Sequence, residues 1–283
     1  MNTELLRNPI QTRERVTDAR QSGFSVGLVP TMGDLHAGHG ALIDCARRHD
    51  DFLAVSIFVN PIQFNVASDY EKYTRNLDRD FEFCRQRGVD LVFAPDARDM
   101  YPVPLKTHVD VSGLTDLLCG EFRPGHFRGV ATVVAKLFHI LPADRAYFGE
   151  KDAQQLAVIR RMVTDLNFPV KIVGVPTVRD SDGLALSSRN QRLSEAERAV
   201  APRLFKALCA VRDHVAAGCK DAAQAKEAGL AVLAQESMIR VEYFEIVGAD
   251  DIERREVIDG PVLAAAAIWL GETRLIDNVS VHG

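Results

Sequence analysis

The stretch that decides the fold is residues 24–59, which read FSVGLVPTMGDLHAGHGALIDCARRHDDFLAVSIFV. Phe24 to Pro30 has the composition of a buried strand, and the residues from His36 to His49 follow a helical pattern. Phe52 to Val59 is almost continuously apolar, as strands covered on both faces are. A strand, a helix and a second strand in this order predict a right-handed crossover between neighbouring parallel strands.

The same alternation continues as far as Val175. The expected helices are Leu77 to Arg87, Val130 to Leu141 and Ala153 to Leu166, and the expected strands are Val89 to Ala94, Arg145 to Phe148 and Val170 to Val175. Strands and helices that alternate along a chain pack as a parallel sheet with helices on both faces. The sequence therefore predicts an α/β fold with a Rossmann-like, doubly wound parallel sheet.

The pattern changes near Val178. Ser194-Glu-Ala-Glu197 is a capping box that opens a helical stretch to His214, and an Ala-rich helical stretch covers Asp221 to Gln235. Strand candidates follow at 240–247, 262–270 and 273–281, although the alanines at 264–267 suit either a helix or a strand. We therefore expect two domains, which are residues 1–177 with the parallel sheet and residues 178–283 as a smaller C-terminal α+β domain.

Composition narrows the class of protein. The 283 residues include 34 Lys and Arg against 39 Asp and Glu, a formal net charge of −5. Such a chain has no general attraction to nucleic acid or to anionic lipid. Its longest apolar run, Val262 to Leu270, falls far short of the ~20 residues that span a bilayer. Five scattered cysteines offer neither a disulfide framework nor zinc spacing, and residues 1–20 lack an export signal. We expect a cytoplasmic protein with no nucleic-acid or membrane partner.

Polar residues at the strand ends are the first candidates for chemistry, because ligands bind at the carboxyl ends of parallel strands. The first strand leads into a segment that reads PTMGDLHAGH, residues 30–39. His36 and His39 are spaced to emerge on one face of a helix, and the N–H groups of a helix start favour a bound phosphate. Gly33 and Gly38 lack the Cβ atoms that would hold a nucleotide away. Taken alone, a simple turn at a helix start is the commoner explanation.

The second strand ends at Asn60-Pro61, since proline cannot continue a ladder of hydrogen bonds. The amide of Gln63 follows and can grip a hydroxyl or a carboxylate. A loop-capping amide explains Gln63 about as well when the segment is judged alone.

The strand that begins at Arg145 runs into GEKDAQQ, residues 149–155. Gly149 permits a tight turn, and Lys151 supplies a cation unless it is simply solvated at the surface. Asp152 can cap the next helix or orient a ligand, and Gln155 faces the same crevice from the first turn of that helix.

A polar segment, VRDSDGLALSSRN, occupies residues 178–190. Ser187 and Ser188 offer hydroxyl groups, and Arg189 offers a fork of donors that matches phosphate oxygens. Alone, the segment could be an ordinary polar interdomain loop.

Five motifs, taken in order, resemble those of the pantothenate synthetase family. They are P-T-M-G-x-L-H-x-G-H from Pro30, F-V-N-P-x-Q-F from Phe58, R-P-G-H-F-R-G-V from Arg123, F-G-E-K-D-x-Q-Q from Phe148 and D-G-L-A-L-S-S-R-N from Asp182. The tail from Trp269 to Asn278 agrees as well. The first motif also resembles the H-I-G-H signature of the nucleotidyltransferases, with Ala37 in place of isoleucine.

The resemblance implies an AMP-forming ligase of pantothenate biosynthesis. Such an enzyme activates pantoate with ATP to pantoyl-adenylate and pyrophosphate, and β-alanine then displaces AMP to give pantothenate. The implied ATP site comprises Met32, Gly33, Asp34, Leu35, His36, Ala37, Gly38, His39, Gly149, Glu150, Lys151, Asp152, Val178, Leu186, Ser187, Ser188 and Arg189. The loop 186–190 would close over the nucleotide.

The same resemblance assigns roles to single residues. His39 matches the proton donor of the family, and His36 and Lys151 would share the charge on the reacting phosphorus. The loop residues Ser187, Ser188 and Arg189 complete the catalytic set. Gln63 and Gln155 would hold pantoate, Gln63 would also meet β-alanine, and Asn60 and Arg123 would contribute. Mg²⁺ would arrive with the ATP phosphates, with Asp152 the nearest carboxylate by motif and no protein ligand assigned. The resemblance also implies a homodimer.

Three rival functions differ from this expectation. A nucleotidyltransferase of the same superfamily would retain the nucleotide in its product. An RNA-binding relative or a synthetase fragment fits poorly with the acidic composition. A non-catalytic nucleotide sensor would tolerate the loss of His39, Lys151 or Arg189, and all three are present.

Overall fold

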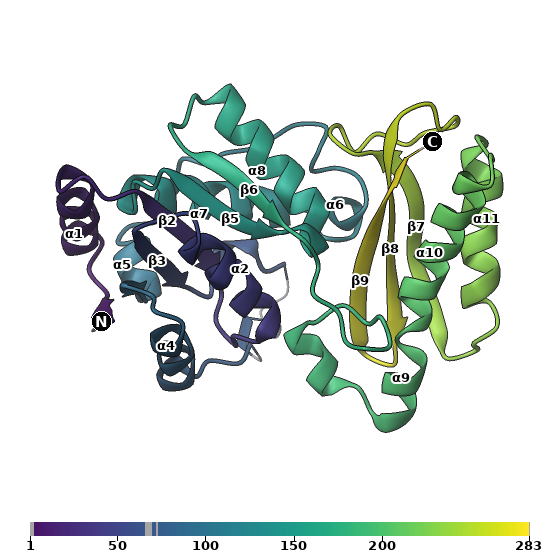
Figure 1. Ribbon diagram of the computed structural model, residues 1–283, viewed down its shortest axis with the longest axis horizontal. Helices are drawn as coiled ribbons and strands as arrows, with labels where there is room; N and C mark the ends of the chain where they lie inside the picture. Colours follow the sequence, from purple (N-terminus) through teal and green to yellow (C-terminus); the bar gives the residue numbers. More distant parts are fainter. Residues whose placement is uncertain (1–2, 66–69, 72, 283) are drawn as a thin grey trace.

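The computed structural model describes residues 3–65, 70–71 and 73–282, and two sheets dominate it (Figure 1). The larger sheet has six parallel strands in the order β1-β4-β3-β2-β5-β6. These strands are β1 (Glu4–Leu6), β2 (Val26–Thr31), β3 (Phe52–Ile57), β4 (Leu91–Phe93), β5 (Arg145–Gly149) and β6 (Lys171–Val175). The strand order reverses between β2 and β5, so the predicted doubly wound α/β fold is confirmed. A crevice for ligands is expected at that reversal.

Helices cover both faces of the parallel sheet. They are α1 (Pro9–Gln21), α2 (Ala37–Arg47), α4 (Leu77–Gln86), α5 (Ala97–Met100), α6 (Cys119–Phe122), α7 (His126–Ile140) and α8 (Ala153–Asp165), with the 3-10 turns η1 (Pro61–Gln63) and η2 (Glu150–Asp152). Adjacent strand residues point to opposite faces, since Leu28 shares a core with α7 and α8 whereas Val29 shares one with α2 and α4. Burial on both faces explains why these strands read as unbroken apolar runs.

The smaller sheet is antiparallel, in the order β7-β8-β9. Its elements are η3 (Ser188–Arg192), α9 (Glu195–Val200), α10 (Arg203–Ala216), α11 (Ala222–Leu233), β7 (Ile239–Gly248), β8 (Pro261–Leu270) and β9 (Thr273–His282). The helices α10 and α11 pack on one face of it (Figure 1). The ambiguous alanines lie in β8, where Ala264 and Ala266 face the core under these helices and Ala265 faces the core of the larger sheet. The two sheets therefore share a continuous apolar contact.

The structure differs from the sequence-based expectation in the N-terminal segment, at the start of α7 and in the helical stretch after Ser194. β1 and α1 occupy the polar N-terminal segment, where the Asn8 side chain accepts hydrogen bonds from the N–H groups of Ile10 and Gln11 and starts the helix. The helix expected from Val130 begins at His126, after Gly125 in a left-handed conformation. The long helix expected from Ser194 is divided at Pro202, because proline has no N–H to continue the hydrogen-bond ladder. Its predicted capping box of Ser194 and Glu197 is confirmed.

Candidate active site

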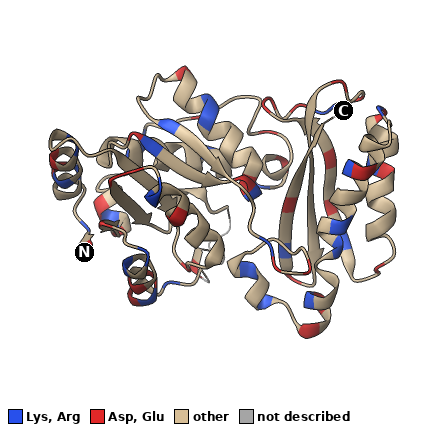
Figure 2. Ribbon diagram, viewed as in Figure 1, with Lys and Arg blue, Asp and Glu red and all other residues tan. Residues whose placement is uncertain are grey.

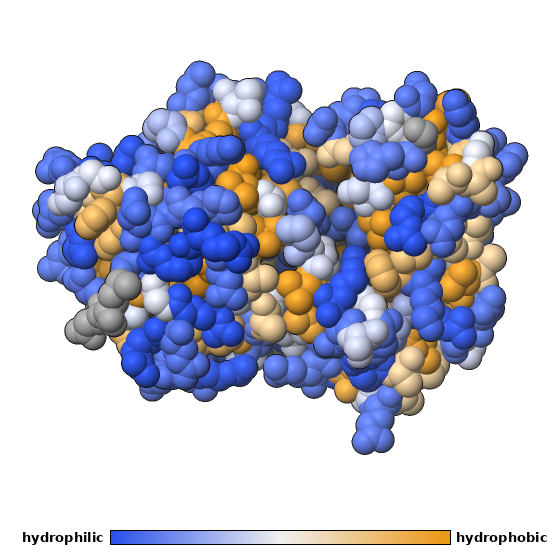
Figure 3. Space-filling view, in the orientation of Figure 1, coloured by the Kyte–Doolittle hydropathy of each residue, from blue (hydrophilic) through white to orange (hydrophobic). Residues whose placement is uncertain are grey.

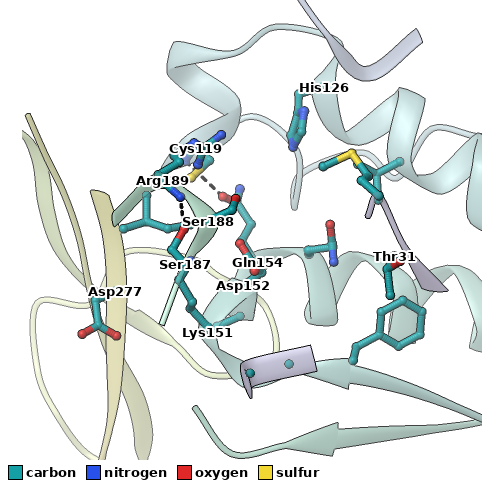
Figure 4. Close-up of a pocket in the computed structure, with 18 of the residues that line it drawn as sticks. Thr31, Cys119, His126, Lys151, Asp152, Gln154, Ser187, Ser188, Arg189 and Asp277 are labelled. Carbon is teal, nitrogen blue, oxygen red and sulfur yellow. Dashed lines mark hydrogen bonds between the residues drawn. The ribbon is translucent and has the colours of Figure 1, made fainter. Parts of the chain in front are cut away.

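A cavity of about 430 Å³ lies at the carboxyl ends of β2, β3, β5 and β6, and the strands β8 and β9 form its opposite wall. Figure 3 shows a hollow between two lobes, one built on the parallel sheet and the other on the antiparallel sheet, and apolar side chains are visible in this hollow. The close-up in Figure 4 places Lys151, Asp152, Ser187 and Ser188 together, with His126 projecting toward the same space. The volume lies within the range typical of small-molecule sites.

The cavity brings together most of the residues singled out in the sequence, all of which the structure describes. Its wall includes Met32, His36, Gly38, His39, Asn60, Gln63, Arg123, Gly149, Lys151, Asp152, Gln155, Val178, Leu186, Ser187, Ser188 and Arg189. Five predicted ATP-site residues lie outside that wall, namely Gly33, Asp34, Leu35, Ala37 and Glu150. The side chains of Asp34 and Leu35 are buried beneath the loop, so only their backbone could face a ligand.

The start of α2 is capped by its own histidines. His36 is the N-cap residue, and its Nδ1 accepts a hydrogen bond from the N–H of Gly38 at 3.1 Å. The Nδ1 of His39 accepts from the N–H of His36 at 3.3 Å. The N–H of Gly38, one of the N–H groups at this helix start, is therefore already bonded within the protein. Because both Nδ1 atoms accept, each neutral ring carries its proton on Nε2.

Burial keeps these two rings neutral. Burial and the nearby charge of Lys151 lower the pKa of His36, and burial with the neighbouring His36 lowers the pKa of His39 to about 3. The two ring centroids lie 4.2 Å apart. Near pH 7 the start of α2 thus presents two neutral N–H donors, which suit phosphate oxygens without adding positive charge.

The loop before α2 is held by Asp80, a residue that sequence reasoning missed. The Asp80 carboxylate in α4 accepts hydrogen bonds from the N–H groups of Asp34 and Leu35 at 2.9 and 2.8 Å. Gly33 has a φ of +86°, and a Cβ there would lie 2.9 Å from Asp80 Oδ2. The glycine in this motif is therefore required both by its backbone conformation and by the packed carboxylate.

Gln63 is oriented by a small network of polar groups. Asn60 Nδ2 donates to Gln63 Oε1 at 3.0 Å and to the carbonyl of Gly129 at 3.1 Å. Gln63 Nε2 in turn lies 3.1 Å from Met32 Sδ, and the Tyr101 hydroxyl donates to Asn60 Oδ1 at 2.7 Å. Asn60, which the sequence predicted as a contributor to binding, therefore orients the side-chain amide of Gln63 through a direct hydrogen bond.

His126 also contacts the Gln63 segment, and sequence reasoning assigned it no individual role. Its Nδ1 lies 2.8 Å from the backbone carbonyl of Gln63. Burial and the charge of Arg123 lower the pKa of His126 to about 4. The motif that begins at Arg123 was the available signal, but nothing in a single sequence shows that its histidine meets η1.

Strand β9 holds the two polar loops of the site, which are residues 149–155 and 178–190. Asn278 Nδ2 donates to the carbonyls of Glu150 and Lys151, each at 2.9 Å. The preceding residue, Asp277, pairs with Arg179 through contacts of 2.5 and 3.0 Å at the start of the segment that leads to Arg189. In the other polar loop, Gln155 lines the cavity, whereas the adjacent glutamine at 154 binds the backbone of the 114–119 segment.

Among the residues that the structure describes, no group of three or more His, Cys, Asp or Glu side chains could hold a metal ion. Nor is any helix in the described part of the chain long and apolar enough to cross a membrane. Lys and Arg are interspersed with Asp and Glu over both lobes (Figure 2).

Known proteins resemble this chain over nearly its whole length. The profile of the family described as pantoate-beta-alanine ligase matches residues 4–280. A pantothenate synthetase from Moorella thermoacetica is 51% identical over 276 residues, which cover 98% of both chains. A solved pantothenate synthetase from Thermus thermophilus has a TM-score of 0.94 at 46% identity, covering 99% of this chain and 100% of that one. A pantoate-beta-alanine ligase from Francisella tularensis, solved with beta-gamma ATP and beta-alanine, has a TM-score of 0.80 at 30% identity, covering 98% of this chain and 97% of that one.

Proposed function

Because the chain belongs to the pantoate-beta-alanine ligase family, we propose that it joins pantoate to β-alanine with consumption of ATP. The reaction proceeds through pantoyl-adenylate and releases pyrophosphate and AMP. The observation that supports this most is the convergence of the separate sequence motifs on one cavity at the reversal of the strand order.

Adenylation solves a chemical problem. A carboxylate is a poor electrophile at neutral pH, and attack of its oxygen on the α-phosphorus of ATP converts it into a mixed anhydride with AMP as leaving group. His36 and His39 donate from Nε2 to the phosphate oxygens, and Lys151 adds positive charge as negative charge builds up. Donors fixed in advance stabilise a transition state because they need no reorganisation.

The ATP contacts come from three segments and from the backbone of Val178. Residues 32–39 and 149–152 surround the ribose and phosphates, and the backbone of Val178 meets the adenine. Residues Leu186 to Arg189 close over the triphosphate, so that residues 178–283 act as a domain that completes the site of residues 1–177. The hydrogen bonds from Asn278 and the Asp277–Arg179 pair support this role, because they tie β9 to both polar loops.

Gln63 and Gln155 hold pantoate, and Gln63 also meets β-alanine. Both amides line the cavity, and the bonds from Asn60 and to Met32 fix the orientation of Gln63. Arg123 lines the same wall and offers charge to an anionic group.

Mg²⁺ enters with ATP as part of the substrate. This ion keeps several waters and binds mainly through phosphate oxygens, so it needs few protein ligands. Asp152 lines the cavity next to Lys151 and is the carboxylate best placed by motif to approach it.

Two further properties are proposed from the resemblance and the composition. The protein forms a homodimer, which light scattering on the purified chain tests. It acts in the cytoplasm, in keeping with five cysteines that are all free thiols.

The nucleotidyltransferase alternative is not favoured, because the relatives of the chain are pantothenate synthetases. Product analysis tests the choice: the purified chain is incubated with ATP, Mg²⁺, pantoate and β-alanine, and the products are separated by mass. Pantothenate and free AMP in equal amounts support the ligase. A stable adenylylated product without pantothenate would overturn the ligase and support the nucleotidyltransferase.

A further inference from the structure

The cavity contains imidazoles of two opposite kinds. His36 and His39 accept backbone N–H groups at Nδ1, so their Nε2 atoms are donors. His126 differs, because its Nδ1 lies 2.8 Å from a carbonyl oxygen, and only a protonated Nδ1 can donate there. In a neutral His126 ring the lone pair therefore lies on Nε2, which makes this atom a hydrogen-bond and proton acceptor.

This acceptor lies where the second substrate is expected. The carbonyl that binds His126 belongs to Gln63, the residue assigned to both pantoate and β-alanine, and His126 itself lines the cavity. Gly129 lets α7 approach closely, since a Cβ there would lie 2.5 Å from the carbonyl oxygen of Ile62 and 2.7 Å from Gln63 Cα. The closeness of His126 to Gln63 is thus built into the packing of α7 on η1.

Burial, together with the charges around it, keeps His126 neutral before the substrates bind. Arg123 and, more weakly, Arg189 oppose its protonation, whereas Asp152 favours it. The phosphate of an adenylate and the carboxylate of β-alanine would add negative charge beside these arginines. Both additions make a proton on the imidazole less costly at the stage where one must be accepted.

The second step requires such an acceptor. An aliphatic ammonium group has a pKa of about 10, so β-alanine arrives almost entirely protonated and without a nucleophilic lone pair. We propose that His126 is the base that removes this proton, an inference that rests on the proposed function.

The atoms balance without another reagent. One ammonium proton passes to Nε2 of His126, and the electron pair released on nitrogen forms the bond to the acyl carbon of pantoyl-adenylate. The bond from that carbon to the phosphate oxygen breaks, and its electron pair leaves with AMP. The second proton, acidic in the adduct, departs on the phosphate of AMP, and the imidazolium returns its own proton to water.

The test separates the two steps in the purified full chain. The variant is His126→Asn, whose side-chain amide can still donate to the carbonyl of Gln63 but has no atom at the Nε2 position. Pantoate-dependent exchange of pyrophosphate into ATP reports the first step and also shows that the variant is folded. Transfer of pantoate from preformed adenylate to β-alanine is expected to fall ~10²–10⁴-fold, the usual range for loss of a general base.

Two readouts distinguish a base from a residue that only shapes the site. Hydroxylamine is neutral near pH 7 and needs no deprotonation to attack. With hydroxylamine as the nucleophile, His126→Asn should therefore transfer pantoate from the adenylate at the same rate as the parent chain. The deficit with β-alanine should shrink as the pH rises toward the pKa of the ammonium group. His139→Asn, an exposed histidine of the same helix, is the control and should change neither rate.

Equal losses with β-alanine and hydroxylamine, loss of exchange in the variant, or unchanged transfer to β-alanine would each overturn the assignment of His126. A parent chain that catalyses no exchange would instead overturn the proposed function, and this inference with it. His126→Gln provides a second variant, since an amide can accept a hydrogen bond but not a proton. It should show the same dependence on the nucleophile.

Discussion

The loops that carry the candidate residues are held by side chains far away in the sequence. Asp80 binds the two N–H groups after Gly33, and Asn278 binds the two carbonyls at Glu150 and Lys151. Asp80 uses both carboxylate oxygens, and Asn278 uses its side-chain NH₂ group twice, to bind backbone atoms. Each residue therefore fixes the position of a loop and leaves the exposed side chains of that loop to the ligand. The chemistry of the site therefore depends on residues that need not touch a substrate.

Lys151 is expected to stabilise charge on the reacting phosphorus. Lys151→Ala should lower the rate of adenylate formation ~10²–10³-fold, the usual loss when one preorganised donor is removed. Lys171→Ala is the matched control, because Lys171 is exposed at the opposite end of the neighbouring strand β6. Rapid-quench measurement of pyrophosphate release checks both, and near-parental rates in Lys151→Ala would refute the assigned role.

Asp80 is expected to position the ATP loop without contacting ATP. In Asp80→Asn one acceptor oxygen becomes an NH₂ group facing a backbone N–H, so one of two charge-assisted bonds is lost, worth ~1.5–3 kcal/mol. The KM for ATP should rise ~10-fold or more, with a smaller change in kcat. The exposed Asp78, in the same helix, provides Asp78→Asn as control. An unchanged KM in Asp80→Asn would show that the loop does not need this carboxylate.

Local motifs in the sequence predicted His36, His39, Gln63 and Lys151 because each follows a strand directly. Asp80, His126 and Asn278 could not be found in that way. Each meets the site through the packing of one element on another, and a single sequence does not reveal which elements touch. For a related reason, the sequence did not show that the His36 side chain would fold back to accept the N–H of Gly38 at the helix start.

Among the elements, the contact between α7 and η1 determines the position of Gln63. That contact has room only for a glycine at 129, which leaves the backbone of η1 directly against the helix. The elements themselves followed from apolar periodicity. The exceptions were β1 and α1, whose segment is too polar to show a buried face, the four-residue helices α5 and α6, which are too short to show a period, and the division between α9 and α10 at Pro202.

Gly129→Ala should displace η1 and weaken pantoate binding. The added methyl group would overlap the carbonyl oxygen of Ile62, and overpacking of this kind costs ~1–3 kcal/mol. Calorimetry should show a pantoate Kd that is ~10-fold higher. Gly260→Ala is the control, since its Cβ would meet open space. Identical pantoate affinities in the two variants would contradict the role given to this contact.

Across the whole molecule, half-buried histidines couple stability to pH. The pKa values of His39 and His126 are lowered to about 3 and about 4, so the unfolded chain binds more protons than the folded one below the ordinary histidine pKa. The free energy of unfolding should therefore fall as the pH drops from about 6.5 toward 4, by ~1.4 kcal/mol per pH unit for each such group.

Denaturant unfolding between pH 7 and pH 5 measures this dependence. The free energy of unfolding of His39→Gln should depend less steeply on pH than that of the parent chain, because one of the groups that resist protonation is gone. His214→Gln, which alters an exposed histidine, should retain the parental slope. A slope in His39→Gln equal to that of the parent would show that His39 does not resist protonation in the folded chain.

Every role assigned to these residues depends on one cavity in which an acid attacks ATP. The most direct measurement is the exchange of labelled pyrophosphate into ATP by the purified chain, with and without pantoate and in the absence of β-alanine. Exchange that requires pantoate and proceeds without β-alanine is the predicted result. Exchange without pantoate, or none until β-alanine is added, would contradict an adenylate formed in a separate first step.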